Sequence, residues 1–228
     1  MGRLTLLLLI IGLVASGCSV FGIRTAEELE YTVLQSANEV ELRQYAPYVS
    51  AEASVDGTLD TVQGDLFRVL AGYIFGKNTK QQDIAMTAPV VMEPTADLNE
   101  TDESGQQTNG ESESIAMTAP VTMAQSEDGV WTMAFSMPSS YTMDTLPKPL
   151  DKRVTLVQVP QRTVAVFEFS GFFDNEDNRS EGRRVLSHWL KNNPSYRAVG
   201  RPFYAGYDPP FTLPFLRRNE VLLTIEAI

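Results

Sequence analysis

The chain contains one cysteine and one histidine, Cys18 and His188, among its 228 residues. A single cysteine excludes a disulfide within the chain. A zinc cluster built from Cys and His needs about four ligands, more than this chain can supply. A Ser-His-Asp or Cys-His catalytic group would have to use His188. Because nucleophile-elbow and phosphate-loop motifs are also missing from the sequence, it does not favour an enzyme.

Cys18 follows a short apolar segment. Arg3 provides a positive start, residues 4–14 are almost entirely apolar, and residues 15–17 are small. The apolar run is shorter than the roughly 20 residues of a membrane-spanning helix, which favours a cleaved export signal over an anchor helix. Small residues that end at a cysteine resemble a bacterial lipobox. The resemblance implies cleavage before Cys18 and a lipid on its sulfur, and Ser19 implies sorting to the outer membrane, facing the periplasm.

The formal net charge of −11 and the pI of about 4.6 argue against a nucleic-acid partner, because phosphate backbones repel an acidic surface. Residues 93–114 hold seven acidic residues, no basic ones and only two aliphatic ones, Ala96 and Leu98. Such a segment cannot build a core, so we predict a disordered acidic insertion. It could bind a partner, but a solvated loop is the simpler interpretation.

Two periodicities alternate in the first half of the exported chain. Residues 38–45 and 49–55 alternate polar and apolar side chains, which predicts two antiparallel strands. Over residues 61–75 the apolar residues recur on one helical face, which predicts a helix. The heptapeptide IAMTAPV occurs twice, at 84–90 and at 115–121, and we interpret both copies as strand segments with proline at an edge or end.

The second half repeats the order of strands, helix and strands. The predicted strands cover residues 130–137, 154–159, 163–169, 203–207 and 220–225, and the second helix covers 176–190. The fold class is therefore α+β, a duplicated unit that forms a distorted antiparallel β-barrel or sheet with two flanking helices. We divide the chain into a lipoprotein signal peptide (1–17), a tether (18–29) and one domain (30–228).

The motifs of this domain, in their order, resemble the SOUL haem-binding family. They are VELRQY (40–45), LAGYIFGKN (70–78), the two IAMTAPV copies, MPSSY (137–141), AGYDPP (205–210) and RRNEV (217–221). The resemblance covers about residues 30–228 and implies a distorted β-barrel with two helices. It also implies a shallow apolar groove that binds haem or a related porphyrin, in part against the first helix.

The implied contacts lie on the apolar side of that helix. We expect the tetrapyrrole to contact five residues: Phe67, Arg68, Leu70, Ala71 and Ile74. Gln44 stands where a member of the family has an axial histidine, so haem or a free porphyrin would be bound without a His ligand, and we assign no metal-ligating residue.

Other residues have two interpretations each. His188 could ligate iron, although a surface histidine is the simpler interpretation, and Met86 and Met117 fit strand packing better than iron ligation. Arg217 and Arg218 could clamp propionates, or form a structural ion pair with Glu220 or Asp208. The sequence thus predicts a non-catalytic, haem- or porphyrin-binding lipoprotein of the cell envelope. The alternative is a binder of another amphiphile, or a structural envelope lipoprotein without haem.

Overall fold

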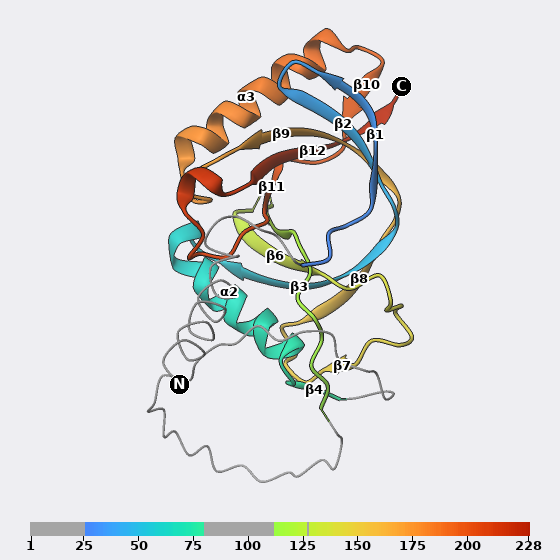
Figure 1. The fold of residues 1–228 in the computed structure, drawn as a ribbon, viewed down its shortest axis with the longest axis vertical. Helices are drawn as coiled ribbons and strands as arrows, with labels where there is room; N and C mark the ends of the chain where they lie inside the picture. Colours follow the sequence, from blue (N-terminus) through green and yellow to red (C-terminus); the bar gives the residue numbers. More distant parts are fainter. Residues whose placement is uncertain (1–25, 80–111, 127) are drawn as a thin grey trace, which may run out of the picture.

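A computed structural model describes residues 26–79, 112–126 and 128–228 of the chain (Figure 1). The helices are α2 (Leu59–Ile74), α3 (Glu176–Asn192) and the short 3-10 helix η1 (Pro214–Leu216). The strands are β1 (Tyr31–Ala37), β2 (Val40–Tyr45), β3 (Tyr48–Asp56), β4 (Asn78–Thr79), β5 (Val121–Gln125), β6 (Val130–Ser136), β7 (Lys148–Pro149), β8 (Thr155–Val159), β9 (Arg162–Phe169), β10 (Tyr196–Ala198), β11 (Phe203–Gly206) and β12 (Asn219–Ala227).

Ten of the strands form one antiparallel sheet that curls into a half-barrel (Figure 1). Its order is β1-β2-β9-β12-β11-β5-β6-β3-β8, with β10 added at β12, and β4 and β7 pair separately. Strands from the two halves of the chain lie side by side at β2–β9, β11–β5 and β3–β8. The predicted α+β class, a curled antiparallel sheet with two helices, is confirmed.

Both helices cover the same face of this sheet. From α2, Leu66, Leu70 and Tyr73 are buried against β3 and β6, and α3 packs on β9 and β12. The opposite face carries a smaller apolar cluster that includes Val164 and Leu222. Residues of the central strands β9 and β12 therefore alternate between two covered faces, whereas β1 and β8 are more exposed.

The two helices begin and end for local reasons. The predicted ranges, 61–75 and 176–190, agree with α2 and α3 to within two residues. The chain leaves α2 at Gly76, whose φ of 112° suits glycine. At α3 the side chain of Asn175 accepts a hydrogen bond from the Asn178 backbone, and the first turn is acidic, which complements the helix dipole.

The second IAMTAPV copy is not a strand, which corrects our expectation. The β5 ladder begins only at Val121, and residues 115–120 are irregular. Their backbone groups bond elsewhere: Ile115 N donates to Ile74 O at 2.7 Å, and Ala119 N donates to Glu27 O at 2.8 Å. The first copy, at 84–90, lies outside the described residues.

Most of the predicted acidic insertion also lies outside the described residues, except 112–114. Glu113 is buried, and its carboxylate accepts a hydrogen bond from Tyr141 Oη at 2.8 Å. The Asn78 side chain bonds both backbone groups of Glu113, at 2.7 and 2.9 Å. Residues 113–115 therefore lie directly beside the end of α2.

Candidate functional site

The residues that we expected to bind a ligand share helix α2 but face in different directions. Leu70 and Ile74 are only 0% and 1% exposed and belong to the main core. Phe67 is half-buried, with its ring 5.5 Å from the ring of Phe135 in an edge-on contact. Arg68 and Ala71 lie toward the other side, where Arg68 is exposed. The structure thus separates the five residues into a core-facing set and an outward set, and their contact with a ligand stays a prediction.

The outward face of α2, which we call the flat face, carries three small residues, Gly64, Ala71 and Gly72. Gly64, Arg68 and Ala71 follow each other along it at helical spacing, and Gly72 lies beside them. A Cβ atom added at Gly64 would meet nothing within 4 Å. Phe75, which follows the helix, is 43% exposed at the end of this face. Arg68 and Asp65 project from this face. The positions of Gly64, Ala71 and Gly72 carry little or no side chain, so a planar macrocycle could approach the helix closely at them.

Two cations flank this face. The guanidinium of Arg68 is exposed and pairs with Asp65 at 2.7 Å, a contact that solvent weakens. The side chain of Lys77 lies along Gly72, since a Cβ added there would be 3.1 Å from Lys77 Cδ. Sequence reasoning missed Lys77, which reaches the helix only because the chain reverses at Gly76. Cations at the edge of a flat apolar face are suited to the carboxylates of a porphyrin.

Axial ligands for iron are not evident among the described residues. His188 is exposed on α3, where its Nε2 lies 2.9 Å from Asn192 Nδ2, so the interpretation as a surface histidine is confirmed. Met117 packs against the main core, and Met86 lies outside the described residues. Within the described ranges, no three His, Cys, Asp or Glu side chains are grouped to hold a metal ion.

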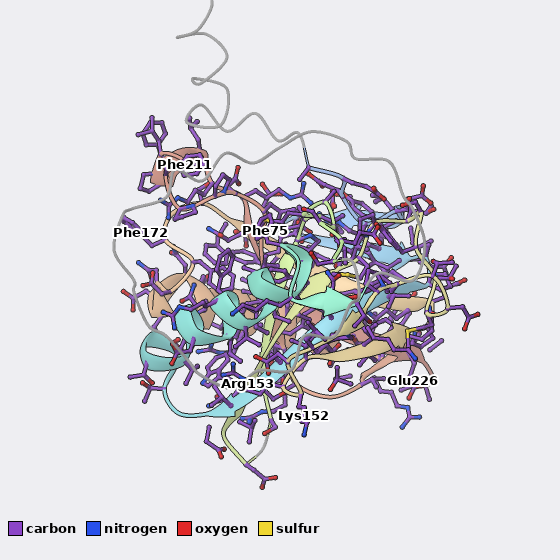
Figure 2. All side chains as sticks on the ribbon, turned by 90° about the horizontal axis from the view of Figure 1, so that it is seen from below. Phe75, Lys152, Arg153, Phe172, Phe211 and Glu226 are labelled. Carbon is purple, nitrogen blue, oxygen red and sulfur yellow. The ribbon has the colours of Figure 1, made fainter. Side chains whose placement is uncertain are left out.

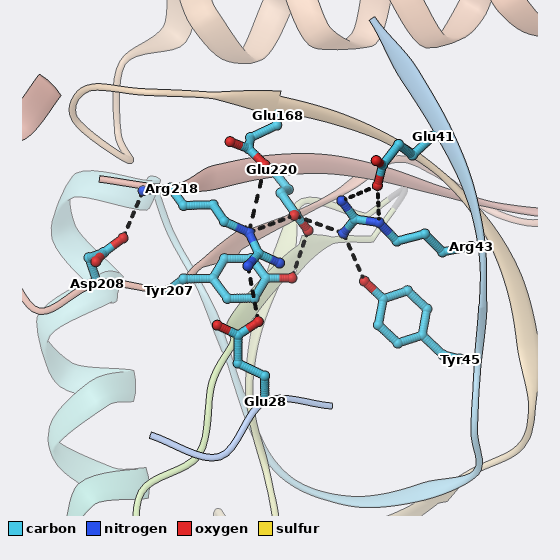
Figure 3. A network of polar contacts seen from close by, with 9 residues as sticks. All are labelled: Glu28, Glu41, Arg43, Tyr45, Glu168, Tyr207, Asp208, Arg218 and Glu220. Atoms are coloured by element: carbon cyan, nitrogen blue, oxygen red, sulfur yellow. Dashed lines mark hydrogen bonds and ion pairs between the residues drawn. The ribbon is translucent and has the colours of Figure 1, made fainter. Parts of the chain in front are cut away.

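A buried network of charges lies on the sheet face opposite the helices (Figure 3). Glu220, on β12, is 0% exposed and receives Arg43 Nη1 at 2.8 Å and Arg218 Nε at 3.0 Å. Tyr207 Oη donates to the same carboxylate at 2.7 Å. Arg218 also pairs with Glu28 at 3.0 Å, which fixes the start of the described chain. One carboxylate therefore joins β2, β11 and β12.

The charges of this network are paired with one another, which favours a structural role over ligand binding. Burial, followed by the negative charge of Glu220, raises the pKa of Tyr207 well above its usual value. Burial opposes the charge of Arg43, but the Glu220 carboxylate outweighs it and the pKa of Arg43 is raised. The Arg218–Glu220 ion pair expected as the simpler interpretation is confirmed. Arg217 donates instead to the Thr212 carbonyl, at 2.8 Å.

A cavity of about 230 Å³ opens near the start of the described chain. Its lining includes Glu27, Glu28 and Glu30 together with Tyr48 and Met137. Pockets for drug-sized ligands hold roughly 300–1,000 Å³ and are mostly apolar. The cavity is too small for a tetrapyrrole, and its three carboxylates would repel propionates, so the flat face of α2 is the better candidate.

Comparison with known proteins identifies the family. The sequence matches the family model described as SOUL heme-binding protein over residues 26–104 and 104–224. The chain belongs to the SOUL haem-binding family. Two relatives of this SOUL chain are heme-binding protein 2 of Homo sapiens and heme-binding protein 2 of Mus musculus. Each is 28% identical over 186 residues, which cover 80% of this chain and 76% of the relative.

Solved structures share the fold of the SOUL chain. The crystal structure of the EcmrR C-terminal domain superposes with a TM-score of 0.53 and 8% identity, covering 87% of this chain and 99% of that one. An uncharacterized conserved protein from Listeria innocua gives a TM-score of 0.50 and 13% identity, over 82% of this chain and 92% of that one. At these identities the likeness concerns the fold alone.

Proposed function

We propose that this chain binds haem or a free porphyrin on the outward face of α2, as a lipid-anchored protein of the bacterial cell envelope. The observation that carries the proposal is the SOUL family match over residues 26–104 and 104–224, with relatives named heme-binding proteins. The flat face at Gly64 and Ala71 supports it, because it can receive a planar ring without moving the core.

Hemin titration tests the face directly. We expect a saturable change in the Soret band with the native protein and at least about tenfold weaker binding with Ala71→Glu, a loss of about 1.4 kcal/mol. The added carboxylate would occupy the middle of the face and repel propionates. Phe67→Asp is a poorer test, because Phe67 also packs on Phe135 and its loss would disturb the core.

The matched control is Ser187→Glu, which places the same side chain at an exposed position of α3. It should leave the hemin titration unchanged, and both variants should keep the native circular dichroism spectrum. Equal hemin affinity for Ala71→Glu and the native protein would exclude the outward face of α2 as the site. Loss of binding in both variants would point to a general charge effect instead.

A second prediction concerns iron. Since Gln44 stands where a member of the family has an axial histidine, we expect protoporphyrin IX to bind within about threefold of the hemin affinity, because the ring rather than the metal supplies the contacts. Fluorescence titration with the iron-free porphyrin measures this. A much tighter complex with hemin, together with a six-coordinate haem spectrum, would contradict ring-only binding.

The envelope part of the proposal rests on the sequence around Cys18. Within the described residues no helix is long and apolar enough to cross a membrane. The attachment that we propose is lipid on Cys18, where each buried methylene contributes about 0.8 kcal/mol and several acyl chains hold the protein stably.

Mass spectrometry of the protein from a bacterial membrane fraction checks the anchor. We expect a chain that begins at Cys18 and carries a diacylglyceryl group and an acylated amine. The control Cys18→Ser should lose this mass increment and leave the detergent phase. An intact Met1 chain with an unmodified cysteine would contradict the lipid anchor and leave the haem-binding proposal untouched.

A further inference from the structure

The loop between β11 and β12 presents apolar side chains to solvent. Four residues form this surface, which we call the loop patch: Phe211 is 58% exposed, Leu213 37%, Phe215 69%, and Phe172, from the connection between β9 and α3, 55%. Figure 2 shows Phe211 and Phe172 at the left of the molecule, away from Lys152 and Arg153 at the bottom of the view and Glu226 at the right. An apolar group of this kind marks an interaction surface more often than isolated exposed residues do.

The loop patch is held in place by its own backbone. Gly171 N donates to Pro214 O at 2.9 Å, which joins the two segments that form it. The guanidinium of Arg217 lies 5.2 Å from the centre of the Phe172 ring, while its Nε bonds the Thr212 carbonyl. These contacts fix the loop with its aromatic side chains outward, so their exposure is a feature of the fold.

The charge around the patch differs from that of the whole chain. The chain has a net charge of −11, yet residues 209–217 contain no acidic residue and one arginine. The adjacent Asp208 turns its carboxylate toward the backbone of Arg218, at 2.7 Å. The loop of residues 209–217 can therefore enter the interface of a phospholipid bilayer without carrying carboxylates into it. Phe172 lies at the edge of the patch, because the exposed residues Asp174, Glu176 and Asp177 follow it.

The start of the described chain is joined to the chain just after the patch. Glu28 pairs with Arg218, the residue that directly follows the loop (Figure 3). Cys18 precedes Glu28 by ten residues, a length that spans at most about 35 Å when fully extended. A lipid on Cys18 would therefore hold this side of the domain near the bilayer.

We propose that the loop patch contacts the phospholipid bilayer, so that the domain rests on the membrane through Phe211, Leu213, Phe215 and Phe172. The inference rests on the proposed lipid anchor for its orientation. Each apolar side chain that enters the bilayer interface strengthens attachment, so partial insertion of several adds to the hold of the acyl chains. The flat face of α2 is not needed for this contact and stays available to a ligand.

A fluorescent label tests the orientation. A lipidated Cys18 has no free thiol, and the chain has no other cysteine, so Leu213→Cys provides a single site for an environment-sensitive dye. In phosphatidylcholine vesicles we expect a blue shift and at least a twofold rise in its emission. The matched control is Leu150→Cys, at 55% exposure in the connection between β7 and β8, whose dye should keep its emission in water.

A second form of the chain separates the loop from the anchor. The Cys18→Ser protein carries the same dye labels and is mixed with vesicles at millimolar lipid. We expect a smaller blue shift of the dye at position 213. The double substitution Phe211→Ser and Phe215→Ser should abolish that shift. If mass spectrometry finds Cys18 unmodified, the lipid anchor is rejected but the loop contact is not. If the dye at position 213 keeps its emission in water in both forms, the loop patch does not contact the bilayer. A blue shift that appears without vesicles, on adding hemin or raising the protein concentration, would also overturn the proposal. Because the contact is apolar, the blue shift should not require the anionic lipid phosphatidylglycerol in the vesicles.

Discussion

Replacing Glu220 with alanine is expected to lower the free energy of unfolding by about 3–5 kcal/mol. The carboxylate is fully buried and is shared by Arg43, at 2.8 Å, and Arg218, at 3.0 Å (Figure 3). Its removal leaves Arg43, which is 4% exposed, with only the partly exposed Glu41 as a charged partner. An uncompensated buried charge costs more than the lost pair would have contributed. Urea unfolding followed by circular dichroism measures the change.

The matched control lies on the same strand. Glu226 pairs with Arg197 near the end of β12, but both side chains are exposed, so Glu226→Ala should cost no more than about 1 kcal/mol. If Glu220→Ala fails to fold, Glu220→Gln keeps the shape and an acceptor for Tyr207 and should still be clearly destabilised. If Glu220→Ala and Glu226→Ala lowered the free energy of unfolding equally, burial would not determine how much the network contributes to stability.

The network illustrates what the sequence could not give. Glu41 and Arg43 alternate with Val40 and Leu42, which correctly indicated a strand, and alternating charges normally mean a solvent face. The face is covered here because β9 and β12, from the far half of the chain, bring the Glu220 carboxylate to 2.8 Å from the Arg43 guanidinium, although the two residues are 177 positions apart. No local pattern carries that pairing. Periodicity located both helices and most of the longer strands, but not β1 or the short strands β4, β7 and β10.

The candidate site was predicted in part for a related reason. The period of α2 located its apolar side, but the same stripe serves the core, and Leu70 and Ile74 are covered by the sheet. Periodicity alone therefore identified the residues of α2 that pack in the core, while the family resemblance supplied the link between α2 and a ligand. The signal for a flat outward face was the spacing of Gly64 and Gly72, two residues that lower helix propensity without an evident local reason.

Two glycines in the two helices should respond to the same substitution with opposite signs. Gly182→Ala is expected to lower the free energy of unfolding by about 1–3 kcal/mol, the usual cost of overpacking. A Cβ at Gly182 would lie 2.4 Å from Val221 Cγ2 and 2.8 Å from Phe167 Cδ1, so α3 could not keep its distance from β9 and β12. Gly64→Ala should instead raise the free energy of unfolding by about 0.5–1 kcal/mol, since a Cβ atom at Gly64 would meet no neighbour.

Urea titrations of both variants measure the difference, and Gly64→Ala serves as the control because it makes the same chemical change in a helix of similar length. Helix propensity favours alanine at both sites, so a loss at Gly182 alone isolates the contact with the sheet. If Gly182→Ala were neutral or stabilising, α3 would have to sit farther from Val221 than described. That displacement would also loosen β12, the strand that carries Glu220, so the two variants test the same packing from its two faces.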